Sequence, residues 1–164
     1  MRILVFGNSG SGKSTYAKAL VRTHRLAHLD LDSIVWAPGQ IAVERPRHAV
    51  RESISMFLRE NLEWVIEGCY GELIEEALPH CTRLVFLNPG LEVCLRNNRH
   101  RPWEPHKYAS AAGQDAMFDA LQYWVTAYYT RDDALSLAYH RRLFDSYHGE
   151  KEEILASREC VADP

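Results

Sequence analysis

The chain carries Gly7-Asn8-Ser9-Gly10-Ser11-Gly12-Lys13-Ser14-Thr15 close to its first residue. This run fits the pattern Gly-x-x-x-x-Gly-Lys-Ser/Thr at every fixed position, and its glycines let the backbone wrap closely around a phosphate group. Residues 2–6 before it have the length and apolar character of a buried parallel strand. Ala17, Leu20 and Val21 after it recur at helical spacing. Strand, glycine loop and helix in this order predict a site at which backbone N–H groups and a helix N-terminus face one anion.

The side chains of the glycine loop predict a nucleotide site. Lys13 supplies a positive charge for the outer phosphates, and the Ser14 hydroxyl can ligate Mg²⁺. We therefore expect all nine residues from Gly7 to Thr15 to bind ATP, with Mg²⁺ as the accompanying ion. The alternative is a Gly/Ser-rich turn that matches by accident, which requires all the fixed positions to coincide in the right context.

Composition indicates a compact enzyme-sized chain. It has 164 residues, of which 46% are hydrophobic and 25% charged, and this predicts one globular domain over residues 1–164. The formal net charge of -3 shows no basic excess, so direct nucleic-acid binding is not expected. No stretch reaches the length needed to span a membrane, and the four cysteines lack Cys-x-x-Cys spacing. These features predict a cytoplasmic protein with reduced thiols and leave the oligomeric state open.

Strand, loop and helix alternate along the chain, which predicts a parallel sheet with helices on both faces. Apolar runs predict further strands at residues 26–29, 63–68, 83–87 and 152–156. Helical periodicity is expected from Pro46 onward, over 91–99, on one face of 117–128 and over 133–147. The polar stretch 100–113 contains two prolines and looks like an excursion from the sheet.

Four segments together resemble the small P-loop kinases of the adenylate kinase type, and most of all the short proteins named as DNA topology modulation proteins. They are the glycine loop, Leu-Asp-Ser-Ile-Val-Trp-Ala-Pro-Gly at 31–39, Trp-Val-Ile-Glu-Gly-Cys-Tyr at 64–70 and Leu-Val-Phe-Leu-Asn at 84–88. The resemblance covers nearly the whole chain. It implies a P-loop NTPase fold, a three-layer α/β/α sandwich whose parallel sheet of about five strands has the order 2-3-1-4-5. It also implies a lid segment at about 99–130 and preference for ATP.

Acidic residues at the carboxyl ends of strands are the candidates for positioning the acceptor, because ligands of open α/β sheets bind there. Asp30 and Asp32 follow the second predicted strand, and both carboxylates face one side if the chain stays extended. Asp32 matches the family position, so we expect it to orient an acceptor hydroxyl, accept its proton or hold Mg²⁺ through water. The alternative for both residues is an aspartate that caps a turn.

Two positions depart from the family pattern. Glu67 ends the third predicted strand, where related kinases usually carry aspartate. It could reach metal-bound water or the acceptor, or make a structural hydrogen bond to a neighbouring turn. Asn88 ends the fourth strand in place of an acidic residue. An amide adds no negative charge, which argues against a metal role there.

Arginines and aromatic residues complete the predicted site. Arg96 and Arg99 share a face of a predicted helix, and with Arg101 they stand where the predicted lid begins. The alternative is that these arginines are solvated surface residues. The resemblance implies that paired late arginines clamp the moving phosphate, and we expect Arg131 and Arg142 in this role. On one unbroken helix these two would lie about 16 Å apart. Ring stacking on the substrate, with packing as the alternative, is considered for Trp36, Tyr70, Trp103 and Tyr108.

The first hypothesis is an ATP-dependent phosphotransferase that moves the γ-phosphate of Mg-ATP to a small acceptor, with nucleotides and nucleosides among the candidates. Lys13, Asp32, Arg96, Arg99, Arg131 and Arg142 would be its catalytic residues, and Asp32, Trp36, Glu67 and Tyr70 would contact the acceptor. The alternative is an ATP-binding regulatory protein of the DNA topology modulation type with little or no kinase activity. The departures at Glu67 and Asn88 favour that alternative. Slow ATP hydrolysis as the only activity is a third possibility.

Overall fold

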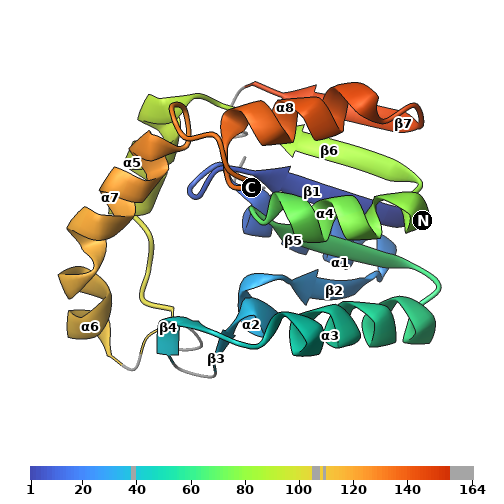
Figure 1. Cartoon of the computed structure of the whole chain (residues 1–164), viewed down its shortest axis with the longest axis horizontal. Coiled ribbons are helices and arrows are strands. Elements are labelled where there is room, and N and C mark those ends of the chain that lie inside the picture. Colours follow the sequence, from blue (N-terminus) through green and yellow to red (C-terminus); the bar gives the residue numbers. More distant parts are fainter. Residues whose placement is uncertain (38–39, 105–107, 109, 156–164) are drawn as a thin grey trace, which may run out of the picture.

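A computed structural model describes residues 1–37, 40–104, 108 and 110–155. Its centre is a five-stranded parallel sheet with the spatial order β2-β5-β1-β6-β7 (Figure 1). Counted along the chain within this sheet, the order is 2-3-1-4-5, as predicted. The strands are β1 (Arg2–Gly7), β2 (Ala27–Asp30), β5 (Trp64–Gly68), β6 (Arg83–Leu87) and β7 (Glu150–Ile154).

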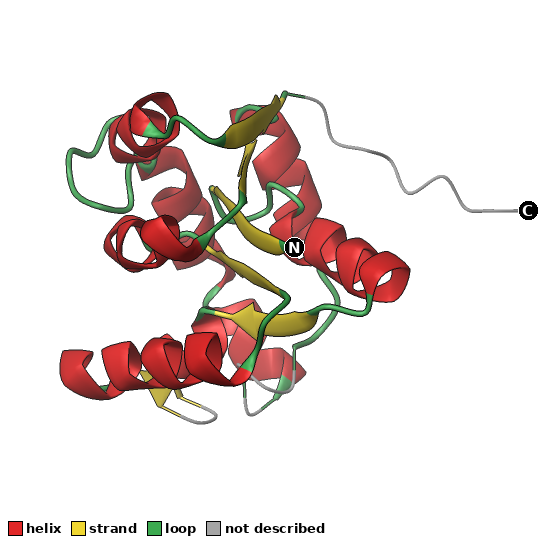
Figure 2. Cartoon of the chain, turned by 90° about the vertical axis from the view of Figure 1, so that its right-hand side faces the viewer, coloured by secondary structure: helices red, strands yellow, loops and turns green. Residues whose placement is uncertain are grey.

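The alternating side chains of β1 divide the core into two apolar clusters, one on each face of the sheet. Ile3 and Val5 pack on the face covered by α1 (Lys13–His24). Leu4 and Phe6 pack on the opposite face. Three helices cover that opposite face: α3 (Arg47–Glu60), α4 (Gly71–Ala77) and α8 (Leu137–Ser146). The sheet therefore lies between two helical layers, as Figure 2 shows from the side, and the predicted three-layer α/β/α sandwich is confirmed.

The remaining elements gather beyond the carboxyl ends of the strands, at the left of Figure 1. Among the described elements, one short element is not part of this group: the 3₁₀ turn Leu78–His80 directly follows α4 and extends it. The gathered elements are α2 (Asp32–Val35), the antiparallel pair β3 (Trp36–Ala37) and β4 (Gln40–Glu44), α5 (Leu91–Arg99), α6 (Ala111–Ala116) and α7 (Phe118–Ala127).

Most predicted boundaries agree with the structure to within one residue, and β6 and α5 have the predicted bounds. The helix expected over 133–147 is wrong at its beginning: α8 starts at Leu137 because the Ser136 side chain accepts a hydrogen bond from the Tyr139 N–H and caps it. The last strand begins at Glu150 rather than at residue 152. Pro46 precedes α3 as its N-cap instead of opening it. The β3–β4 pair was not predicted at all.

Two further sequence predictions concern the thiols and the membrane. Cys69 and Cys94 are buried free thiols, Cys81 is partly buried, and Cys160 lies outside the described residues. Within the described part of the chain, no helix combines the length and the apolar character that crossing a bilayer requires.

Candidate active site

The glycine loop between β1 and α1 has a conformation that requires glycine. Gly10 has φ +77°, and a Cβ there would lie 2.3 Å from the Cys94 carbonyl oxygen of α5. Gly12 has φ +96°, yet nothing lies within 4 Å of the place where its Cβ would be. The loop is therefore pressed against α5 on one side and open at the start of α1.

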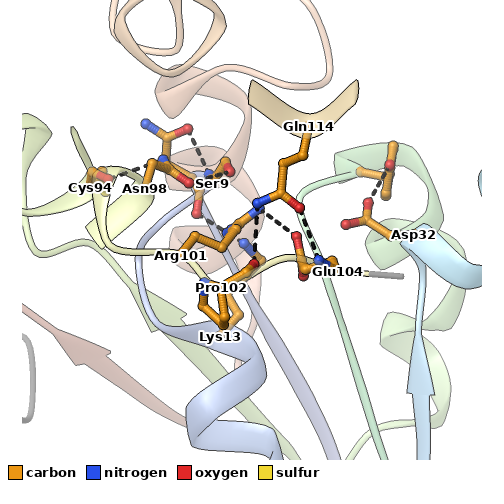
Figure 3. A network of polar contacts seen from close by, with 11 residues as sticks. Ser9, Lys13, Asp32, Cys94, Asn98, Arg101, Pro102, Glu104 and Gln114 are labelled. Atoms are coloured by element: carbon orange, nitrogen blue, oxygen red, sulfur yellow. Dashed lines mark hydrogen bonds and ion pairs between the residues drawn. The ribbon is translucent and has the colours of Figure 1, made fainter. Parts of the chain in front are cut away.

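Hydrogen bonds from the loop itself and from α5 hold it in shape. Lys13 Nζ donates to the Asn8 carbonyl at 2.9 Å, and Asn8 Oδ1 accepts from the Ser9 N–H at 2.8 Å. Asn97 Nδ2 donates to the Gly10 carbonyl at 2.8 Å, and Ser9 Oγ lies 3.4 Å from Asn98 Oδ1 (Figure 3). Neither Asn97 nor Asn98 was predicted from the sequence.

A sequence signal for Asn98 did exist. Leu91, Cys94 and Asn98 recur at helical spacing, so the sequence places a polar side chain on the apolar face of this helix, and in the structure Asn98 is buried there. A polar residue at such a position needs a partner, and Asn98 Nδ2 finds one in the Cys94 carbonyl at 3.0 Å.

A cavity of about 670 Å³ opens at the carboxyl ends of the strands. It brings together side chains from the glycine loop, α2, β3, β5 and the segment after β5. The predicted site residues that line it are Ser9, Lys13, Ser14, Asp32, Trp36, Glu67 and Tyr70. Tyr108 lines it as well, whereas Trp103 does not and is 49% exposed.

Asp32 stands at the first residue of α2 and is held toward the cavity by Tyr70. The Tyr70 hydroxyl donates to Asp32 Oδ1 at 2.5 Å, and burial raises the pKa of Tyr70, which keeps the phenol protonated. Asp30 Oδ1 accepts from the Asp32 N–H at 2.9 Å. The chain is therefore not extended between the two aspartates, and Asp30 caps a turn, which was the alternative considered for it.

Glu67 is a buried carboxyl beside the glycine loop, only 2% exposed. Burial, reinforced by the nearby Asp30 carboxylate, raises the pKa of Glu67 to about 7, while Lys13 and a hydrogen bond with Ser14 act in the opposite direction. His28 Nε2 lies 3.8 Å from Glu67 Oε1. That oxygen has no hydrogen-bond partner among the residues that the structure describes. Such an atom is unusual in a folded protein and marks a place for a further polar ligand.

The arginines predicted for the lid and the phosphate clamp lie outside the residues that line this cavity. Arg96 and Arg99 are exposed on α5. Arg131 pairs with Asp133 in the turn after α7, with Nε and Oδ2 at 2.9 Å, and stacks over the Trp124 ring. Arg142 stacks over a tyrosine ring of its own helix. The single unbroken helix considered for Arg131 and Arg142 is wrong, because α7 ends at Ala127 and α8 begins ten residues later.

Arg101 lines the cavity from the segment after α5. Its Nη1 lies 3.2 Å from Glu104 Oε2. Gln114 of α6 fixes this segment: its Nε2 donates to the Pro102 carbonyl at 3.2 Å, and its Oε1 accepts from the Glu104 N–H at 2.9 Å (Figure 3). Of the arginines considered near the predicted lid, Arg101 is thus the one that the described structure places on the cavity.

Three arginines around the start of α3 also line the cavity, and none of them was predicted from the sequence. Arg45 Nη1 donates to the Ile34 carbonyl at 2.8 Å. Arg47 and Arg51 form ion pairs with glutamates of α4, Glu72 and Glu76. For Arg47 and Arg51 the available signal was their spacing of four residues directly after Pro46, which places both on one face of the predicted helix.

Helix α7 supplies an apolar wall opposite these cations. Ala120, Leu121 and Trp124 line the cavity from this helix, and Met117 lines it from the N-cap position. Trp36 and Tyr70 add an aromatic pair with ring centroids 6.3 Å apart. Within the described residues, no group of three His, Cys, Asp or Glu side chains is arranged to hold a metal ion.

Solved structures of kinases share this fold. A putative kinase from Chloroflexus aurantiacus j-10-fl has a TM-score of 0.53 and 16% identity over 93% of this chain and 86% of its own. A sugar kinase from Janibacter sp. HTCC2649 has a TM-score of 0.52 and 14% identity over 93% and 83% of the two chains. A gluconokinase from Sinorhizobium meliloti 1021 has a TM-score of 0.50 and 16% identity over 99% and 83%. No protein-family model matches the sequence, and no curated protein matches it. The chain has a P-loop kinase-like fold.

Proposed function

We propose that the protein is an ATP-dependent phosphotransferase that moves the γ-phosphate of Mg-ATP to a small acceptor. One observation carries this proposal: Lys13, Ser14, Asp32 and Glu67 all line the same cavity at the carboxyl ends of the strands. Phosphoryl transfer needs a cation for the phosphates, a place for the metal and a group that orients the acceptor, and these four side chains supply them.

The residues present fit a magnesium nucleotide. The Glu67 carboxyl interacts with the Ser14 hydroxyl and with the charge of Lys13, and the loop is open at Gly12. Mg²⁺ prefers oxygen ligands and keeps several waters, so one hydroxyl and a carboxylate acting through water suffice. When bound, the magnesium nucleotide supplies the phosphoryl group and neutralises part of its charge. Lys13 and the loop N–H groups hold the phosphates, and residues 99–130 act as the lid.

Asp32 is the residue that positions the acceptor. Tyr70 fixes one of its carboxylate oxygens, so the group has a defined direction toward the cavity. In this position Asp32 orients the attacking hydroxyl and takes its proton. Arg101 is the lid residue that already lines the cavity. Arg99 stands at the start of the lid and would have to move with it to reach the transferred phosphate, whereas Arg96, Arg131 and Arg142 lie outside residues 99–130.

The cavity favours an acceptor with an anionic group and an apolar face. Arg45 provides positive charge on one wall, beside the ion pairs that Arg47 and Arg51 form with Glu72 and Glu76, whereas α7 presents methyl, methylene and indole groups on the other. A polyol leaves such an apolar wall without partners for its hydroxyls, which lowers its affinity relative to a ring compound. A nucleotide therefore fits this site better than an open-chain sugar acid.

A phosphotransfer screen tests the proposed function. Wild-type protein, Lys13→Met and Lys18→Met are incubated with Mg-ATP and a panel of nucleoside monophosphates, nucleosides and sugar acids. Lys18 is the matched control because it is an exposed lysine of the same helix. We expect transfer by the wild type and by Lys18→Met, and loss of transfer to background in Lys13→Met. Full Mg-ATP-dependent activity in Lys13→Met would sink the assignment.

The regulatory alternative, with membership of the DNA topology modulation group, remains a hypothesis drawn from the sequence resemblance. Its main support was the pair of departures at Glu67 and Asn88. In the structure, Asn88 Nδ2 donates to Glu153 Oε1 at 3.0 Å, and its backbone N–H donates to the Ile154 carbonyl. Asn88 thus fastens β7 to β6, a structural role that implies nothing about weakened catalysis. A salt-sensitive shift of a DNA probe, without transfer to any acceptor, would favour the regulatory role.

A further inference from the structure

Helix α7 is a cavity wall whose C-terminal end is buried. Leu121 and Trp124 line the cavity from this helix, whereas Val125 and Tyr128 at its end are 0% and 1% exposed. The last carbonyls of a helix have no partner within it, so a buried end needs hydrogen-bond donors from elsewhere. Figure 1 shows α7 beside α5 and away from the sheet, so the contacts at this end are where α7 is joined to the glycine loop and to α8.

The first contact comes from the glycine loop. Asn8 is 2% exposed, and its Nδ2 donates to the Val125 carbonyl at 2.9 Å. The orientation of the amide is fixed by chemistry, because its Oδ1 accepts from the Ser9 N–H and a carbonyl can only accept. The Asn8 backbone carbonyl accepts from Lys13 Nζ. One residue therefore contacts both the phosphate-binding lysine and the end of the acceptor wall.

The second contact runs through a buried histidine. His140 of α8 is 0% exposed, and its Nε2 lies 3.0 Å from the Cys69 carbonyl oxygen, so Nε2 carries a proton and donates it. Its Nδ1 lies 2.8 Å from the Tyr128 hydroxyl. The residue after Cys69 is Tyr70, which donates to Asp32. The end of α7 is thus joined to the segment that holds the acceptor carboxylate.

We propose that Asn8, Tyr128 and His140 are positioning residues that fix α7 to the glycine loop and to the Cys69–Tyr70 segment, so that nucleotide binding orders the acceptor wall. This inference rests on the proposed function, since it takes a nucleotide to occupy the glycine loop. The two sites are coupled because both contacts end on the same turn of α7. Neither Asn8 nor His140 needs to touch the acceptor to change its affinity.

Hydrogen–deuterium exchange, with and without the magnesium complex of a non-hydrolysable ATP analogue, tests the coupling. The proteins are the wild type, Tyr128→Phe, Asn8→Ser and Tyr123→Phe. Tyr128→Phe removes one hydroxyl and leaves the ring in place, and Asn8→Ser breaks the other contact independently. Tyr123→Phe is the matched control because Tyr123 is on the same helix and 78% exposed. Amides of residues 9–16 report on the nucleotide, and amides of residues 118–127 report on the wall.

In the wild type and in Tyr123→Phe, the analogue should slow exchange at both the loop and α7. In Tyr128→Phe, the loop should still respond, while the slowing at α7 should fall by about fivefold or more, the lower end of coupling between sites. Asn8→Ser also changes the glycine loop, so it is measured at an analogue concentration that saturates its own loop response, and its α7 slowing should fall to the same extent. A merely structural role would speed exchange in α7 equally with and without the analogue. Two outcomes overturn the inference and leave the proposed function standing. One is slowed exchange at the loop without slowed exchange at α7 in the wild type; the other is undiminished slowing at α7 in both variants. Absence of a loop response in the wild type overturns the proposed function, and the inference falls with it.

Discussion

Protonation of His140 should destabilise the protein between pH 6.5 and 4. Burial lowers the pKa of His140 from 6.5 to about 4; the nearby Lys13 charge acts in the same direction, and the bond to the Cys69 carbonyl opposes it. The unfolded chain therefore binds a proton in this range that the folded protein does not bind. The stability from neutral His140 is fully present above pH 6.5 and is lost as the pH falls toward 4.

The size of the effect follows from the two pKa values. With pKa 6.5 in the unfolded chain and about 4 in the folded protein, lowering the pH from about 7.5 to about 5 costs about 2 kcal/mol of unfolding free energy. Glu67 acts in the opposite direction, because its raised pKa of about 7 gives stability that is lost as the pH rises through that value. The two effects partly cancel in the wild type, so its own pH profile does not isolate His140.

The contribution of His140 is isolated by comparing the pH dependence of the unfolding free energy between variants. Urea unfolding of the wild type, His140→Gln and His24→Gln is measured at pH 7.5 and 5.0, where His24 is an exposed control. We expect His140→Gln to lose about 2 kcal/mol of the wild-type dependence on pH, so that it becomes relatively more stable at the lower pH. His24→Gln should keep the wild-type dependence. Equal pH dependence of His140→Gln and wild type would refute the reasoning. An NMR titration of the wild-type His140 ring, expected to show no protonation above pH 5, does not depend on how well the variant folds.

Three other predictions concern the loop, the acceptor and the general base. Gly10→Ala should lower the free energy of unfolding in urea by about 2 kcal/mol more than Gly12→Ala does. Both positions have positive φ, but only at Gly10 would the new Cβ clash with the Cys94 carbonyl oxygen. Equal losses of unfolding free energy in the two variants would contradict this. Arg45→Ala should raise the KM for an anionic acceptor about tenfold and leave the KM for ATP unchanged. The control is Arg59→Ala, an exposed arginine near the end of α3, and a rise in the KM for ATP alone would argue against an acceptor role. Tyr70→Phe should lower kcat by about tenfold or more, and an unchanged kcat would exclude its orienting role.

The parts of the fold that the sequence predicted are those whose causes are local. Residues 3–6 of β1 and residues 84–87 of β6 are unbroken apolar runs, so these two strands could be assigned without knowing their neighbours. The glycine loop is defined by nine consecutive residues and by the strand and helix that flank it. The strand order came from the resemblance to kinases, because a strand pattern does not state which strand lies beside it.

The misses have equally specific causes. The β3–β4 pair is only two residues long on one side, too short for an alternating pattern to be visible. Helix α8 begins at a serine cap, and the preceding Asp133 forms a turn by accepting from the Leu135 N–H, so helical periodicity alone placed its start too early. The predicted arginines followed the family pattern, whereas in this chain the arginines around the start of α3 line the cavity.

The acceptor side of the cavity was the hardest to predict because its walls come from distant parts of the chain. Arg45 and Trp124 line one cavity only because the crossovers of the sheet bring α3 and α7 to the same edge. Even within the glycine loop, the pattern explains only its fixed positions. Asn8 occupies a position where any residue is allowed, yet its side chain leaves the loop and binds the carbonyl of Val125, a residue 117 positions away. What is particular to this chain is therefore expressed at positions that the motif leaves undefined, and those positions are where its acceptor specificity should be sought.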